Sequence, residues 1–237
     1  MADLTQQELE AAIGELEAAL TDAGPELRAT LVAQLASLRQ TLAMLAAAAP
    51  AMAAARAARR PLTADSAAWF RPRPPVVVPA WVPDDVTRAA VTPALMRCPT
   101  GARLYEDATT VACANAGAAG ATLSVPHGLT LRFDPGGGLA SQSWYERGCL
   151  RWEIRYHANG ARAELGAYVG VEPKTYVEHG VHTRWAANGV VVAQTDWRDG
   201  VRDGWSTLWE DDGYPIVATR FAGGVEVERV MPDVAEG

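Results

Sequence analysis

The sequence predicts an α+β protein with an N-terminal α-helical hairpin, a proline-rich linker and a C-terminal array of antiparallel β-hairpin repeats. Leucines recur at helical spacing near the N-terminus, prolines crowd the middle, and four C-terminal segments share residue types in the same order. The composition also changes from alanine-rich to rich in Trp, Gly and Val, which favours separately folded parts. We expect a helical hairpin over residues 1–60, the linker over 61–95, a short β-hairpin with a loop over 96–126, and the repeats over 127–230.

The first helix is indicated by a capping box and an apolar stripe. Thr5 followed by Glu8 places complementary side chains at a helix start, where backbone donors lack partners. Gly24 and Pro25 end the helix near Asp22, and a second helix follows because proline is tolerated in a first turn. The leucines of this second helix keep four-and-three spacing.

These stripes are the candidate interaction surface of the N-terminal part. A two-helix hairpin buries too little apolar area to offset its chain entropy, so the stripes need a further partner. We expect self-association in the manner of a coiled coil, while another protein or the repeat region of the same chain stays an alternative. The stripe residues are Leu9, Ile13, Leu16, Leu20, Leu31, Leu35, Leu38, Leu42 and Leu45.

The linker carries large apolar residues between its prolines. Proline removes backbone donors and favours extended geometry, so regular helices are excluded from most of it. A solvated tether would rarely carry Trp69, Phe70, Val76 and Trp81. We therefore expect part of the linker to dock, either as a strap along the repeats or in a neighbouring subunit.

A short hairpin is expected after the linker, because residues 103–105 and 110–113 are β-prone runs flanking Glu106 and Asp107. Cys98 and Cys113 then come close enough for a disulfide. Without an export signal we expect both to be reduced. Residues 114–121 are expected to form a loop of small residues.

Four repeats of about 24 residues follow, at 127–150, 151–178, 179–202 and 203–226. Each contains two β-prone runs around a glycine-containing turn. Asn159-Gly160 and Asn188-Gly189 are strong hairpin signals, because both residues adopt positive φ readily. Residues 172–176 are an insertion that we expect to form a loop at one edge.

The aromatic residues of the repeats are expected to stack from one unit to the next as a ladder. A ligand-binding stripe is the alternative interpretation. The ladder residues are Phe133, Tyr145, Tyr156, Tyr168, Trp185, Trp197, Trp209 and Phe221.

With an aromatic before each glycine-containing turn and a second before a terminal glycine, the units resemble bacterial MORN-type repeats, the variant of antitoxin-like proteins. The resemblance implies an elongated single-sheet solenoid used in protein assembly, dimerisation and sometimes lipid contact. The second unit lacks the opening His-Gly found at His127 and His179, and the insertion interrupts the array.

No enzymatic motif is present: there is no phosphate-binding glycine loop, nucleophile elbow or His-Glu metalloprotease helix. His179 and His182 are three apart, so on a strand they point to opposite faces and do not converge on a metal. Residues 210–212 suggest a solvated acidic turn. We expect no catalytic residue, no metal and no cofactor.

Charge and composition restrict the partners. The net charge of −7 with dispersed acidic residues speaks against nucleic acid and against a lipid surface. The stretch Leu42 to Ala55 is broken by Pro50 and reads as too short to span a bilayer. Three cysteines without metal-ligand pairing, and no export signal, suggest a cytoplasmic protein.

The sequence thus favours a non-enzymatic interaction scaffold or an accessory subunit of a larger assembly. Its expected partners are proteins, including further copies of itself. An antitoxin or immunity protein that neutralises a toxin through the repeat face is the alternative. Peripheral membrane contact is a third.

Overall fold

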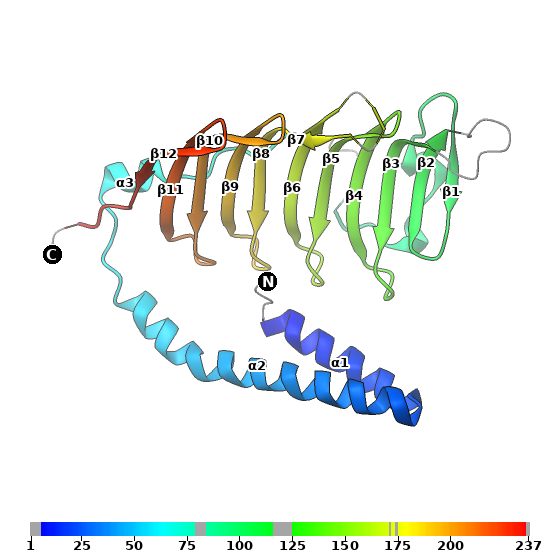
Figure 1. Ribbon diagram of the computed structural model, residues 1–237, viewed down its shortest axis with the longest axis horizontal. Coiled ribbons are helices and arrows are strands. Elements are labelled where there is room, and N and C mark those ends of the chain that lie inside the picture. The colour runs from blue at the N-terminus through cyan, green and yellow to red at the C-terminus, as the bar shows by residue number, and fades with distance from the viewer. Residues whose placement is uncertain (1–5, 79–83, 116–124, 171, 174, 236–237) are drawn as a thin grey trace. The chain divides into compact units, whose positions relative to one another are not determined.

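The computed structural model describes residues 6–78, 84–115, 125–170, 172–173 and 175–235. The chain is α+β and divides into two compact units, Met1–Pro61 with Ala235–Gly237, and Leu62–Val234 (Figure 1). The first unit is helical. The second contains the sheet, and each is described by itself.

The helical unit consists of α1 (Gln6–Asp22) and α2 (Pro25–Ala57). Pro25 occupies the first turn of α2, after an extended Gly24. Arg39 of α2 forms an ion pair with Glu17 of α1. The predicted capping residue Thr5 lies outside the described residues.

The leucine stripes meet between the two helices. Leu9, Leu31 and Leu35 are buried there. The remaining stripe residues are half-buried: Ile13, Leu16, Leu20, Leu38, Leu42 and Leu45. The hairpin thus uses part of its apolar surface internally.

The two helices differ in length, so α2 extends past α1 (Figure 1). At 17 and 33 residues they are about 25 and 50 Å long. Pro50 lies inside α2, which continues to Ala57. By length and composition, Leu27–Ala57 is sufficient to cross a membrane. The expectation that Pro50 leaves too short an apolar segment was therefore wrong.

The second unit is built on one antiparallel sheet. Among the described residues it has twelve strands, in the order β1-β2-β3-β4-β5-β6-β8-β9-β10-β11-β12, with β7 paired to β6 only. The two ends of this order do not pair with each other, so the sheet is open. The strands are β1 (Ala102–Glu106), β2 (Thr110–Asn115), β3 (Val125–Phe133), β4 (Leu139–Glu146), β5 (Cys149–Tyr156), β6 (Arg162–Val169), β7 (Val177–Glu178), β8 (Gly180–Trp185), β9 (Val191–Arg198), β10 (Val201–Trp209), β11 (Pro215–Ala222) and β12 (Val225–Val230).

Four consecutive hairpins of the sheet fall on the four sequence repeats: β3–β4, β5–β6, β8–β9 and β10–β11. In each, the register shifts immediately before the aromatic residue that ends the first strand. These residues are Phe133, Tyr156, Trp185 and Trp209. The turns that follow also repeat, because each closes with a 2.8 Å backbone hydrogen bond.

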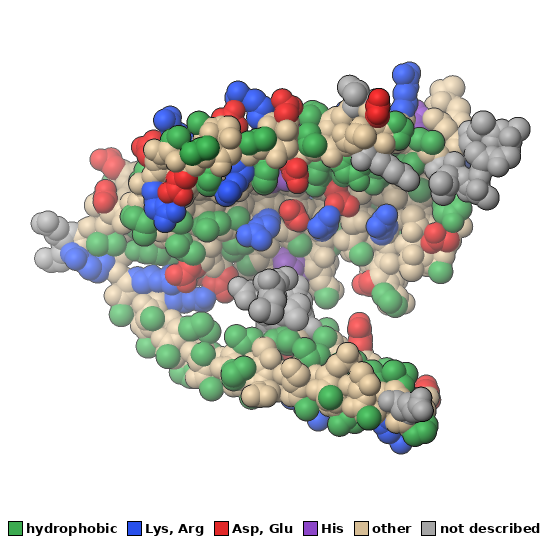
Figure 2. Space-filling model, in the orientation of Figure 1, with side chains coloured by type: hydrophobic (Ala, Val, Ile, Leu, Met, Phe, Trp, Pro, Cys, Tyr) green, Lys and Arg blue, Asp and Glu red, His purple; other side chains and the backbone are tan. Residues whose placement is uncertain are grey.

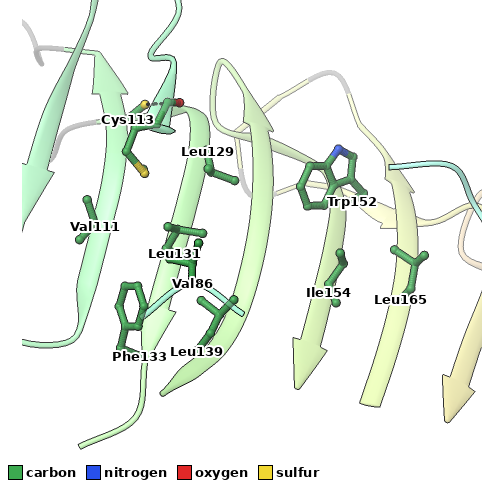
Figure 3. Packing of buried hydrophobic residues seen from close by; sticks show 11 residues of the cluster. Val86, Val111, Cys113, Leu129, Leu131, Phe133, Leu139, Trp152, Ile154 and Leu165 are labelled. Carbon is green, nitrogen blue, oxygen red and sulfur yellow. Dashed lines mark hydrogen bonds between the residues drawn. The ribbon is translucent and has the colours of Figure 1, made fainter. Parts of the chain in front are cut away.

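Strand pairing divides the side chains between two faces, since paired residues share a face and neighbours along a strand alternate. One face, here called the covered face, carries Leu129, Leu131, Ile154 and Leu165, which are buried in the main apolar core (Figure 3). Tyr168, Thr195 and Trp197 lie on the opposite face, here called the open face.

The covered face is filled by the chain that precedes the sheet. This strap (residues 62–78 and 84–99) includes α3 (Ala64–Trp69), the short 3-10 helix η1 (Arg88–Ala90) and α4 (Pro93–Met96). Val86 and Met96 enter the core with the strand residues. Phe70, Val76 and Val78 therefore dock within the same chain, whereas Val77 is exposed and Trp81 lies outside the described residues.

The strap meets the strands in reverse order. Trp209 of β10 donates from Nε1 to the carbonyl oxygen of Phe70 at 2.8 Å. Further along, Asp84 accepts from the hydroxyl of Tyr156 (2.8 Å) and from Nε of Arg162 (2.9 Å). At the far end, the amide of Arg88 donates to the carbonyl of Gly137, between β3 and β4.

Both ends of the strap are fastened. At its start, Leu62 forms a bridge with Val234, and the Thr63 amide donates to the carbonyl of Asp233. At its other end, Cys98 is joined by a disulfide to Cys113 of β2. The expected closeness of the two cysteines is confirmed, but the expectation that both are reduced is wrong, because it was based on the missing export signal and not on their geometry. Cys149 is free and buried.

The predicted aromatic ladder is two rows on two faces. The first-strand aromatics lie on the covered face, as the strap contacts of Tyr156 and Trp209 show. The second-strand aromatics lie on the open face: Tyr145, Tyr168, Trp197 and Phe221. A single ladder does not form, because alternation along each strand points the first-strand aromatics to one face and the second-strand aromatics to the other.

Candidate functional site

A groove on the open face is the candidate site. It lies over β5 to β10 and has a volume of about 720 Å³. Its lining combines aromatic, charged and small polar side chains. Figure 2 shows basic and acidic side chains side by side across the sheet.

One side of the groove is a run of aromatic rings. The ring of Tyr168 lies 5.8 Å from that of Tyr176 and 5.2 Å from that of His182. The His182 ring lies 6.0 Å from that of Trp197. The second-strand aromatics of two neighbouring repeats are thereby connected into one continuous wall.

The other side of the groove is charged. Arg155 forms ion pairs with Glu153 (2.9 Å) and Glu164 (3.6 Å). Arg184 follows on β8, directly opposite Glu164 in the strand register. The wall therefore alternates guanidinium and carboxylate groups, which supply donors and acceptors respectively.

The floor consists of small and hydroxyl-bearing residues. The hydroxyls of Thr195 and Ser206 are 2.9 Å apart. On β6, a side chain at Gly166 would collide with His182, since an added Cβ would lie 2.7 Å from Cε1 of its ring. The small floor residues leave room between the two walls.

The ring of His182 is held in place by a hydrogen bond to the backbone of β6. Its Nε2 lies 2.8 Å from the carbonyl oxygen of Ala167, which only accepts, so Nε2 carries a proton. Burial, with Glu153 and Glu164 nearby, raises the pKa of Tyr168 to about 12, so its hydroxyl stays protonated at neutral pH. Beside the aromatic wall, the guanidinium of Arg202 lies 4.0 Å from the ring centre of Phe221.

A smaller pocket of about 220 Å³ lies where the strap begins. It is lined by Trp69, Arg71, Arg73, Trp205, Thr207 and Trp209. The rings of Trp69 and Trp205 meet edge to face at 4.9 Å. The strap's own tryptophan thus forms one side of this pocket.

The residues predicted to form a site fall in three places. The leucine stripes lie in the helical unit, and the aromatics lie on the two faces of the sheet. The charged wall was missed, although the sequence carries its signal. Arg132, Arg155 and Arg184 each precede a first-strand aromatic, so alternation places them on the open face.

The two histidines considered for a metal do not share an environment. His182 lies in the groove, whereas Nδ1 of His179 lies 3.3 Å from the carboxylate of Asp199 in the turn between β9 and β10. Among the described residues, the carboxylates of Glu210, Asp211 and Asp212 lie within 4.8 Å of one another. That turn is closed by hydrogen bonds of its own, including one from the Tyr214 amide to Asp212.

The fold and the groove define an α+β protein with an open antiparallel sheet, one face of which is covered by its own chain. No family model matches the sequence, and no curated protein matches it. Among solved structures, the chain is similar to the Glycosylation Associate Protein (Gap123) complex from Streptococcus agalactiae, at 12% identity and a TM-score of 0.31. The match covers 53% of this chain and 22% of that one.

Proposed function

We propose that this protein is a non-enzymatic interaction protein, an accessory or structural subunit that binds through the open face of its sheet. The observation that carries this proposal is the asymmetry of the sheet. The covered face is filled by the strap, whereas the open face carries a groove of rings, charges and hydroxyls. A concave groove that brings rings and polar groups together is the usual place for a binding site.

The helical unit is proposed to associate with a second copy. Part of α2 lies beyond the reach of α1, and Met44 and Met52 are exposed there at 58% and 45%. In an apolar stretch of 18 residues within α2, only 6% is buried inside the protein. An alanine-rich helix with so much uncovered apolar surface is stabilised by packing against another helix.

Sedimentation velocity of the full chain tests this association. We expect the unchanged protein to sediment as an oligomer and Met44→Glu/Met52→Glu to sediment as a monomer. Ala18→Glu is the matched control, because Ala18 is exposed on α1, and it should remain oligomeric. A monomeric unchanged protein, or a double variant that still associates, would contradict the proposal.

Membrane contact through α2 is a second candidate, supported by its length and apolar composition. Flotation with liposomes of neutral and anionic phospholipids separates the two. Co-flotation of the unchanged protein and its loss in Met44→Glu/Met52→Glu would favour the membrane. A protein that stays at the bottom of the gradient would contradict membrane contact and favour association between copies.

The sheet is proposed to be a MORN-like solenoid, with four hairpins that each carry a register shift at the same position as support. Its compartment, expected from the sequence to be the cytoplasm, is proposed instead to be an oxidising one. The Cys98–Cys113 disulfide supports this change, because such bonds are rarely kept in the cytosol.

A further inference from the structure

We propose that the open-face groove binds a glycan chain that lies across the strands. This inference rests on the proposed function, since it names the class of ligand for the same face. It is argued from the side chains of the groove and from their order along the sheet.

The groove presents both kinds of surface that a sugar ring needs. A pyranose has a face of C–H groups, which packs on an aromatic ring, and a rim of hydroxyls that both donate and accept hydrogen bonds. Trp197 and Tyr168 offer rings on one wall, while Arg184 and Glu164 offer a donor and an acceptor on the other. The hydroxyls of the floor add groups that do both.

The charges of the groove favour a neutral or sparsely acidic chain. Its lining contains three arginines, Arg155, Arg184 and Arg202, against two glutamates, Glu164 and Glu178. Arg155 is already paired with carboxylates at 2.9 and 3.6 Å. A nucleic acid needs several uncompensated cations along its backbone, and this groove does not supply them.

An extended peptide fits the groove less well than a glycan does. Peptides that add to a sheet bind the backbone of an edge strand, whereas this groove lies over central strands whose backbone groups already pair with neighbours. The groove also lacks an aliphatic pocket for anchoring side chains, since Leu208 and Ala193 are its aliphatic members.

The aromatic position recurs along the sheet, which points to a polymer instead of a single sugar. Tyr168 and Trp197 lie on β6 and β9, two strand positions apart, or about 9.5 Å. The same repeat position is occupied by the half-buried Tyr145 on one side, whereas Phe221 on the other side is buried beneath the guanidinium of Arg202. A chain lying across the strands would meet a ring in each of the first three repeats, at Tyr145, Tyr168 and Trp197.

Affinity electrophoresis of the full chain tests the inference. Native gels containing hydroxyethyl cellulose, arabinoxylan, dextran or polygalacturonate cover neutral and acidic chains of different linkage. We expect retardation by at least one of them, and a dissociation constant about ten-fold higher for Trp197→Ala and for Arg184→Ala. Trp197→Phe, which keeps a ring, should recover most of the binding.

Tyr105→Ala is the matched control, because Tyr105 is an exposed aromatic (49%) on edge strand β1, outside the groove. It should bind as the unchanged protein does. Arg184 is exposed, so its variant is expected to fold, and thermal unfolding of each variant checks this. Absence of retardation in all four gels, or equal weakening by Tyr105→Ala, would overturn the glycan inference. Sedimentation judges the association between copies separately, so an oligomer that binds no glycan sinks this inference alone.

Discussion

The Nη1 atom of Arg73, in the strap, lies 2.7 Å from each of the two carboxylate oxygens of Asp196 on β9. Next to this ion pair, Gln194 accepts from the Arg73 amide and donates to the Arg73 carbonyl, both at 2.8 Å. One residue of the strap is thus bonded through its main chain and its side chain to two alternate residues of one strand. This contact joins the strap to the middle of the covered face.

Arg73→Met should lower the free energy of unfolding by about 1–2 kcal/mol, because it removes a charge-assisted pair with a partly buried carboxylate while keeping the aliphatic stem. Arg198→Met removes a more exposed pair with Asp203, and its expected cost is about 0.5 kcal/mol or less. Urea unfolding followed by tryptophan fluorescence measures both. Equal costs would show that the strap contact is no stronger than an ordinary surface pair.

Gly204→Ala should destabilise the sheet unit by about 2 kcal/mol or more. The residue has φ +120°, and an added Cβ would lie 2.5 Å from Oδ2 of Asp196. Gly213→Ala is the control, because its φ is also positive while its nearest neighbour is 3.5 Å away. Its cost is limited to backbone strain, about 1–2 kcal/mol. Thermal unfolding that ranks Gly213→Ala as the more harmful would contradict this account of the close approach.

The Cys98–Cys113 disulfide determines how many thiols react before and after reduction. Unfolded in denaturant without reductant, the chain should react with one equivalent of Ellman's reagent, from Cys149, and with three after reduction. Cys98→Ala should cost about 3 kcal/mol, since the bond closes a loop with a sequence separation of 15. Three reactive thiols before reduction would remove the covalent end of the strap and the argument for an oxidising compartment.

Stability at high pH should depend on Tyr168. Its folded pKa is raised to about 12 from the ordinary value of 10.0, mainly by burial. Between these two values the unfolded chain loses its proton while the folded chain keeps it, so stability falls as the pH rises from 10 to 12. Burial also raises the pKa of Tyr145 and of Tyr156, so absorbance titration at 295 nm should show several late-titrating tyrosines, and their amplitude should fall by one tyrosine in Tyr168→Phe. A variant with an unchanged titration curve would contradict the burial of this hydroxyl.

Much of the sheet could be predicted from the sequence, because each repeat carries its own turn signal. Asn159-Gly160 marks a hairpin locally, and alternation then fixes which residues share a face. The faces themselves depend on long-range pairing. Tyr145 and Tyr156 look alike in sequence, yet they lie on opposite faces, and only the partner strands and the strap distinguish them.

The groove was beyond local reasoning for a related physical reason. The groove forms where side chains from six strands meet, so no single segment contains it. The closeness of Cys98 and Cys113 followed from the predicted hairpin, but their oxidation did not, because the expectation of free thiols was based on the missing export signal and not on geometry. In α2, the alanine-rich context kept the helix intact at Pro50, against the ordinary effect of an interior proline.

Hydroxyl-radical footprinting of the full chain most directly tests the claim that one face of the sheet is sealed and the other is open. Trp209, only 5% exposed beneath the strap, should be oxidised several-fold more slowly than Trp197 in the groove. Oxidation of Trp197 should in turn become slower when a polysaccharide that slows the protein in the affinity gels is added. The oxidation rate of Trp209 should stay the same. Oxidation of Trp209 as fast as that of Trp197 would contradict the account, because the strap would then not cover the sheet.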